Sequence, residues 1–121
     1  LWPLPPKADL KATVTGTVDA GDYVVERLHF QSLPGLYVTA NLYLPPAAKA
    51  SPDRKGGEAP KCPAVLYVCG HGNTVRGGVS YGSKVTYQYH PAWFATHGYA
   101  CLVIDTLQLG EIQGLHHGTY R

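Results

Sequence analysis

The sequence has little charge of either sign and no long apolar segment. Charged residues make up 15% of its 121 residues, and the net charge is +2 with histidine neutral. The few lysines and arginines form no stripe, so the sequence does not indicate a nucleic-acid-binding protein. No apolar run approaches the roughly 20 residues that a membrane-spanning helix needs. With 45% hydrophobic residues, the composition is typical of one small globular domain.

Cysteine is also scarce, with three residues at positions 62, 69 and 101. Their spacing fits no zinc motif. Cys69 and Cys101 lie inside apolar runs, so we expect buried, inert thiols. A disulfide would suit an exported protein, but the sequence assigns none. No signal peptide is present, which leaves the compartment open, with a secreted or periplasmic location as one alternative. The abrupt end after "GLHHGTY" suggests a piece of something larger.

Alternating apolar residues predict antiparallel strands in the first third of the chain. Residues 11–18 are β-branched and predict a strand. Residues 36–44 alternate cleanly with period two, and residues 22–31 alternate imperfectly, with Glu26 as the exception. The turn "SLPG" joins the two runs, which predicts a hairpin with one wet face. Residues 45–61 predict an exposed loop. The side chains expected on the wet face of the second run are Tyr37, Thr39, Asn41 and Tyr43.

The pattern then changes to continuous apolar runs. Residues 63–70, "PAVLYVCG", and 99–105, "YACLVID", are typical of strands that are buried on both faces of a parallel sheet. Residues 90–98 between them predict a helix, with Pro91 in its first turn and Gly98 at its end. The fold class is therefore α/β, an antiparallel hairpin leading into a parallel, right-handed βαβ unit. The aromatic pair of this helix, Trp93 and Phe94, is expected in the core.

The polar tip "GHGNTVRGG" follows the first of these apolar strands, at an edge where open parallel sheets bind ligands. It contains no phosphate-binding glycine motif. No H-x-x-x-H pair occurs among the histidines, so we predict no metal and no cofactor. An oxyanion hole needs a backbone N–H at an open cleft beside a glycine turn. His71, Gly72 and Asn73 offer these residue types, and an ordinary glycine-rich turn is the alternative.

Several segments together resemble a known family. "PAVLYVCGHGN", "HPAWFATHGYACLVIDTLQLGE", the hairpin "GLYVTANLYLP" and the tail "GLHHGTYR" resemble the N-terminal half of α/β-hydrolase esterases of the acetyl xylan esterase and dienelactone hydrolase-like group. The resemblance extends from about residue 20 to residue 121. It implies that residues 1–121 form a single incomplete domain, the N-terminal portion of an α/β-hydrolase domain.

The resemblance also implies a set of roles. Asn73 would give an oxyanion-hole N–H, while His71 and Gly72 would shape its loop. Asp105 would be structural and hold neighbouring loops. The nucleophile and the rest of the triad would lie beyond residue 121, so we expect the chain alone to be inactive. The second parallel strand would lack its later neighbours, which predicts an unstable fragment.

One formal nucleophile motif is present. "GVSYG", residues 78–82, matches G-x-S-x-G around Ser80. A nucleophile elbow should follow an apolar strand and open a helix, whereas "NTVRG" precedes this motif. We therefore interpret the motif as a chance match.

Three further residues are candidates for binding substrate, namely Glu111, His116 and His117, with Tyr120 beside them. A solvated loop is the alternative for each. The substrate implied by the resemblance is an ester, with acetylated polysaccharide as its class, and the partner is the missing C-terminal part of the domain. Neither nucleic acid nor membrane is expected as a partner. The competing function is a non-catalytic carbohydrate-binding or accessory module, which would use exposed tyrosines and the wet face of the hairpin.

Overall fold

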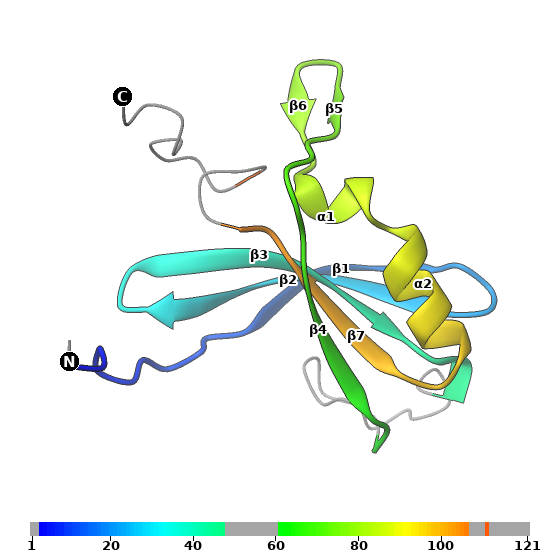
Figure 1. Cartoon of the computed structure of the whole chain (residues 1–121), viewed down its shortest axis with the longest axis horizontal. Helices are drawn as coiled ribbons and strands as arrows, with labels where there is room; N and C mark the ends of the chain where they lie inside the picture. Colours follow the sequence, from blue (N-terminus) through cyan, green and yellow to red (C-terminus); the bar gives the residue numbers. More distant parts are fainter. Residues whose placement is uncertain (1–2, 48–60, 107–110, 112–121) are drawn as a thin grey trace.

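A computed structural model describes residues 3–47, 61–106 and 111 of the chain. Its main feature is a five-stranded mixed sheet, drawn in Figure 1. In spatial order the strands are β1 (Thr13–Asp19), β2 (Val24–Leu33), β3 (Leu36–Leu44), β7 (Ala100–Ile104) and β4 (Ala64–Val68). A short hairpin, β5 (Val75–Arg76) and β6 (Val79–Ser80), and two helices, α1 (Ser83–Thr86) and α2 (Tyr89–Thr96), complete the described elements.

The predicted antiparallel hairpin is confirmed. β2 and β3 pair antiparallel with Leu33 opposite Leu36. Pro34 and Gly35 fill the turn, and Gly35 has φ +77°, the conformation that a glycine after proline supplies in a type II turn. β1 adds to the outer side of β2, also antiparallel.

The prediction that one face of this hairpin is exposed to solvent is wrong for two of the four side chains expected there, Asn41 and Tyr43. Tyr43 is 4% exposed and Asn41 is 6% exposed. Tyr43 belongs to a core cluster with Ala95 of α2 and with Cys101 and Val103 of β7. The face is covered because α2 packs against both β3 and β7, which a pattern read within one strand does not reveal.

The predicted βαβ unit is confirmed in its connectivity. β4 and β7 are parallel neighbours, and α2 lies between them in the chain. β7 also pairs antiparallel with β3, so it sits inside the sheet and is largely buried.

The prediction that the first apolar strand is buried on both faces is wrong for β4. Leu66 and Val68 are 61% and 59% exposed. Within the described ranges β4 pairs only with β7, which makes β4 the edge strand. The unpaired edge that we expected on the second parallel strand therefore belongs to the first, since β7 inserts between β3 and β4.

The helix predicted at 90–98 runs as α2 from Tyr89 to Thr96. His97 caps its C-terminus, and Gly98 follows with φ +87°. Trp93 is not a core anchor: it is 55% exposed and its ring stacks on His97, with centroids 4.0 Å apart. The buried side of the helix is formed instead by Pro91 and Ala95, four residues apart and hence on one face.

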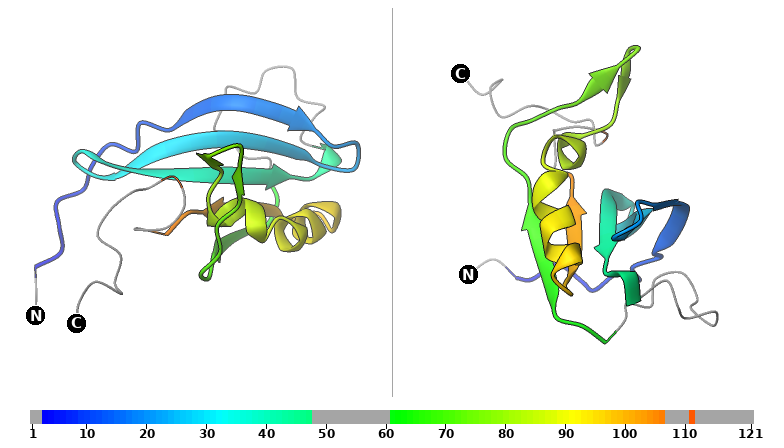
Figure 2. Two further views of the ribbon diagram at one scale, coloured as in Figure 1. Left: turned by 90° about the horizontal axis from the view of Figure 1, so that it is seen from above. Right: turned by 90° about the vertical axis from the view of Figure 1, so that its right-hand side faces the viewer.

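Phe94, the other aromatic residue predicted for the core, is partly buried and packs against the main cluster. Figure 2 shows both helices on the same side of the β4–β7 pair. The opposite face of the sheet carries an apolar groove of about 250 Å³. It is lined by Leu10, Ala12, Leu28, Phe30, Leu42 and Leu102.

The predicted loop over 45–61 falls mainly outside the described residues. Of its described ends, Pro45 is buried, while Pro46, Ala47 and Lys61 are exposed. No described helix is long and apolar enough to cross a bilayer.

Candidate functional site

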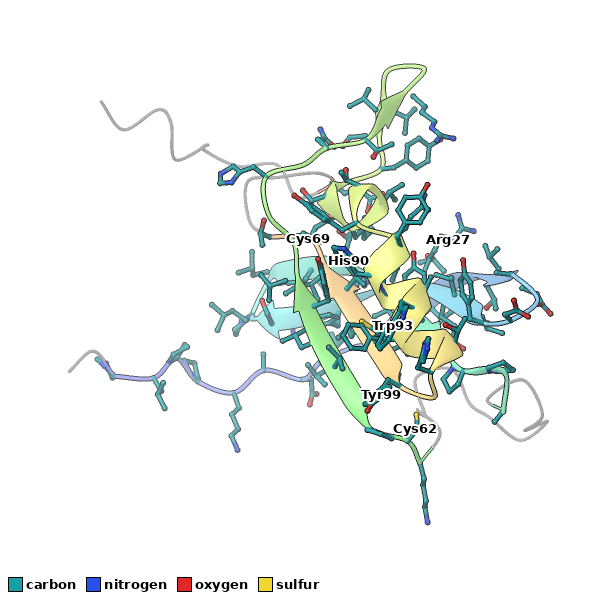
Figure 3. The ribbon with its side chains drawn as sticks, turned by 45° about the vertical axis from the view of Figure 1, so that its right-hand side comes forward. Arg27, Cys62, Cys69, His90, Trp93 and Tyr99 are labelled. Carbon is teal, nitrogen blue, oxygen red and sulfur yellow. The ribbon has the colours of Figure 1, made fainter. Side chains whose placement is uncertain are left out.

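The carboxyl ends of β4 and β7 lie at the same edge of the sheet because the two strands are parallel. The chain continues from β4 into residues 69–74 and from β7 into Asp105 and Thr106. In Figure 3, Cys69 marks this end of β4, and Cys62 marks the opposite end. Ligands of open parallel sheets bind at this kind of edge.

Directly after β7, Asp105 is 1% exposed and accepts three hydrogen bonds. Its carboxylate accepts from the Thr39 hydroxyl at 2.9 Å, from the Lys84 amide at 2.9 Å and from the Lys84 ammonium at 2.6 Å. Asp105 thus joins β3, β7 and α1, as expected for an acid that holds neighbouring loops.

Lys84, which the sequence did not single out, is the buried cation of this cluster. Its Nζ lies 2.6 Å from Asp105 and 2.8 Å from Glu111, and it also donates to the carbonyl of Tyr81 at 3.1 Å. A buried ammonium needs such compensation, because an unpaired charge in the interior is costly. Glu111, proposed as a substrate-binding residue, is therefore engaged in an ion pair.

A polar cavity of about 260 Å³ lies beside this cluster. Nine described residues line it, namely Thr15, Arg27, Leu28, His29, Thr39, Ala40, Asn41, Lys84 and Glu111. The Asn41 Oδ1 and His29 Nδ1 atoms are buried and have no hydrogen-bond partner among the described residues. Unsatisfied buried polar atoms are uncommon and call for an explanation. The cavity has room for a small ligand, and the Asn41 side chain forms part of its lining.

At the end of β4, the polar loop is shaped by close contacts. A Cβ on Gly72 would lie 3.0 Å from the Thr86 side chain, and a Cβ on Gly70 would lie 3.0 Å from the Tyr87 hydroxyl. Neither glycine has a positive φ. Gly72 is therefore favoured by the approach of α1 rather than by a left-handed turn.

Asn73 is exposed at this end of the loop, as is His71. The Asn73 side chain accepts a hydrogen bond from the Ser80 hydroxyl at 2.9 Å. Its backbone amide makes no hydrogen bond to another described backbone or side-chain group. The carbonyl of Gly72, in the same peptide group, accepts a hydrogen bond from the hydroxyl of Ser83. The Asn73 amide is thus able to donate to a ligand.

Ser80 does not sit in a nucleophile elbow. It lies in β6, which pairs antiparallel with β5 through a Gly77-Gly78 turn, both glycines having positive φ. Its own φ is not positive, and its hydroxyl bonds to Asn73. The two glycines of the formal motif serve other purposes, because Gly78 forms this hairpin turn and Gly82 lies against Asp105.

His116, His117 and Tyr120 lie outside the described residues. Among the described residues, no cluster of three or more histidine, cysteine, aspartate or glutamate side chains is arranged to hold a metal ion.

The prediction of buried thiols is confirmed. Cys69 is 6% exposed, Cys101 is 0% exposed, and both are free. Burial, with a smaller contribution from Asp105, raises the pKa of Cys69 to about 11, and burial with the neighbouring Cys69 raises the pKa of Cys101 to about 11. Both thiols stay protonated near neutral pH and are poor nucleophiles.

No family model matches the chain, and no curated protein matches it. Among solved structures, it aligns with the 2.30 Å crystal structure of a "putative acetyl xylan esterase" from Bacteroides fragilis, with a TM-score of 0.58 and 18% sequence identity. The alignment covers 97% of this chain and 29% of that chain, so the chain spans less than a third of the length of the structure it matches. The likeness is one of fold, and the chain accordingly has a partial α/β-hydrolase fold with a mixed sheet and few helices.

Proposed function

We propose that this chain is the N-terminal portion of a serine carboxylic ester hydrolase and that it contributes the oxyanion-hole loop. The observation that carries the proposal is the Asn73 amide. It stands at the carboxyl end of a parallel strand, on an exposed residue, with no acceptor among the described residues. Acyl transfer requires such a donor where negative charge develops on the carbonyl oxygen.

The rest of the catalytic machinery is assigned to sequence beyond residue 121. Each of the described serines donates to a carbonyl or amide oxygen: Ser32 to Leu36, Ser80 to Asn73 and Ser83 to Gly72. None of these hydroxyls is hydrogen-bonded to a histidine. In this proposal a later serine attacks the ester carbonyl, a histidine takes its proton, and the Asn73 amide with a second N–H after the nucleophile stabilises the oxyanion.

The partner of this chain in the proposal is the remainder of the same domain. The exposed edge of β4 and the apolar groove on the face opposite the helices are the surfaces that it would cover. Parallel sheets occur almost only with both faces covered. The proposed substrate is an ester, with acetylated polysaccharide as its class. In this proposal His71 and Gly72 shape the loop. The residues proposed to bind substrate are Glu111, His116 and His117.

The test compares two variants of Asn73 in the whole natural protein, assayed on a p-nitrophenyl ester and on acetylated xylan. Asn73→Pro removes the backbone N–H and should lower kcat about 100- to 1000-fold, the usual effect of losing one oxyanion donor. Asn73→Ala keeps the N–H and removes the side chain, so it should retain activity within a few-fold. Full activity of Asn73→Pro would refute the proposal, as would turnover by the chain alone that Ser80→Ala abolishes.

A carbohydrate-binding or accessory module is the second candidate, favoured by the polar cavity beside Lys84. This cavity lies on the hairpin face that was predicted to be wet, and no described residue donates a hydrogen bond to Asn41 Oδ1 there. Sugar hydroxyls can supply that donor. Binding of a xylo-oligosaccharide that Asn41→Leu abolishes, in a whole protein without esterase activity, would favour the module over the enzyme.

A further inference from the structure

The peptide group between Gly72 and Asn73 is held by one buried side chain. Ser83, at 0% exposure, donates its hydroxyl proton to the carbonyl of Gly72. The described peptide bonds are all trans, and the C=O and N–H of a planar trans peptide point in opposite directions. Fixing the carbonyl of Gly72 toward Ser83 therefore aims the amide of Asn73 away from Ser83.

Ser83 is itself fixed by the end of β7. It is the first residue of α1, and the next amide, that of Lys84, donates to Asp105 Oδ1 at 2.9 Å. The Lys84 ammonium binds the other oxygen of the same carboxylate at 2.6 Å. Two contacts thus anchor the first turn of α1 to a carboxylate that is 1% exposed.

Gly82 makes this anchorage possible. It precedes Ser83 with φ +85°, and a Cβ there would lie 2.2 Å from Asp105 Oδ2. A side chain at this position would displace α1 from Asp105. The loop after β4 is tied to the same place by the backbone, since Tyr81 donates to the carbonyl of Thr74 at 2.9 Å.

We propose that Ser83 is the positioning residue of the Asn73 amide and that Asp105, through the first turn of α1, sets where Ser83 stands. Ser83 touches no substrate; it acts by fixing the orientation of one peptide plane. The inference rests on the proposed function, because the orientation of the Asn73 amide affects catalysis only if this amide donates to the oxyanion. A peptide that is free to rotate would spend part of its time with the N–H turned from the oxyanion, which lowers kcat more than KM.

The experiment uses the whole natural protein with Ser83→Ala and, as a matched control, Ser80→Ala. Both variants remove a serine hydroxyl that bonds to the Gly72–Asn73 segment, but only Ser83→Ala frees the Gly72 carbonyl. Ser83→Ala should lower kcat about 10-fold with KM changed less than about 2-fold. Ser80→Ala should change neither by more than about 2-fold. If Ser83→Ala proves unstable, Ser83→Cys takes its place, since it leaves no cavity and replaces the hydroxyl with a weaker and slightly larger donor.

A second readout separates the inference from the proposed function. The Asn73 amide is followed by NMR while an alkyl boronic acid, a mimic of the tetrahedral intermediate, is added. In the wild type its proton should move downfield, and Ser83→Ala should reduce that shift. If the wild-type amide does not respond, the proposed function falls and this inference falls with it. If it responds equally in both proteins and kcat is unchanged, the proposed function stands and Ser83 has no positioning role.

Discussion

β4 and β7 are adjacent parallel strands of five residues each, and both come from continuous apolar runs. Their environments are opposite. Cys101 and Val103 of β7 are 0% exposed, whereas Leu66 and Val68 of β4 are 61% and 59% exposed. β7 has strand partners on both sides, while β4 has one within the described residues. A continuous apolar run therefore indicates that a strand needs to be buried on both faces. The elements packed around the strand determine whether it is buried.

The two strands differ in the same way at their carboxyl ends. β7 is followed by Asp105, whose oxygens accept hydrogen bonds from three donors on Thr39 and Lys84. β4 ends in a loop whose Asn73 is exposed. Three hydrogen bonds make the first end a structural anchor. The Asn73 amide bonds to no other described group, and the second end is therefore where we propose that the chemistry occurs.

The largest expected effect comes from breaking the anchor of β7. Asp105→Ala leaves the buried Lys84 ammonium with Glu111 as its only carboxylate partner among the described residues. We expect a loss of about 3–5 kcal/mol in the free energy of unfolding, measured by urea denaturation of the whole natural protein. The double variant Asp105→Ala/Lys84→Met should recover much of this loss. If it is as unstable as the single variant, the stranded charge is not the cause.

A smaller effect tests whether β4 becomes as buried as β7 in the whole natural protein. Val103→Ala in β7 should cost about 2 kcal/mol because it leaves a cavity in the core. Leu66→Ala should cost a similar amount, about 2 kcal/mol, if the proposed remainder of the domain covers β4. Leu4→Ala, at a side chain 93% exposed on the N-terminal arm, is the control and should change stability by less than about 0.5 kcal/mol. A cost for Leu66→Ala as small as that of the control would show that β4 remains an open edge.

Local patterns were sufficient to predict most elements of this fold. The alternation in 22–31 and 36–44 specified the hairpin, because successive side chains of a strand point to opposite faces of the sheet. Pro91 and Gly98 bounded α2, since each is compatible with few backbone conformations. The parallel pairing of the two apolar runs followed from the helix between them.

What the sequence could not reveal depends on contacts between distant segments. The insertion of β7 between β3 and β4 decides which strand is the edge, and nothing within either run encodes it. Trp93 is exposed because Pro91 and Ala95 take the buried side of α2. Composition cannot distinguish these sides in an eight-residue helix that is apolar almost all round.

The candidate site divides in the same way. His71, Gly72 and Asn73 could be found because glycine-rich tips after apolar strands have a recognisable composition. Lys84 and Ser83 gave no such signal, because their roles depend on Asp105 and Gly72, which are 21 and 11 residues away in the chain. They occur in the sequence "SKV", residues 83–85, which is equally compatible with an ordinary exposed turn.

The smallest expected effect concerns the thiols beneath this site. Burial raises the pKa of Cys101 from its ordinary 9.0 to about 11 in the folded protein, so the folded state favours the protonated thiol. This stabilisation is complete below pH 9 and is lost as the pH rises toward 11. Between pH 8 and pH 10 we expect Cys101 to account for a loss of about 1 kcal/mol in the free energy of unfolding. Cys101→Ala should flatten the decline by that amount in urea titrations at each pH, while Cys62→Ala controls for the loss of a cysteine as such. If the free energy of unfolding declines equally with pH in the wild type and in Cys101→Ala, burial in β7 does not raise the pKa of the Cys101 thiol. The contrast between β7 and β4 would then depend on packing alone.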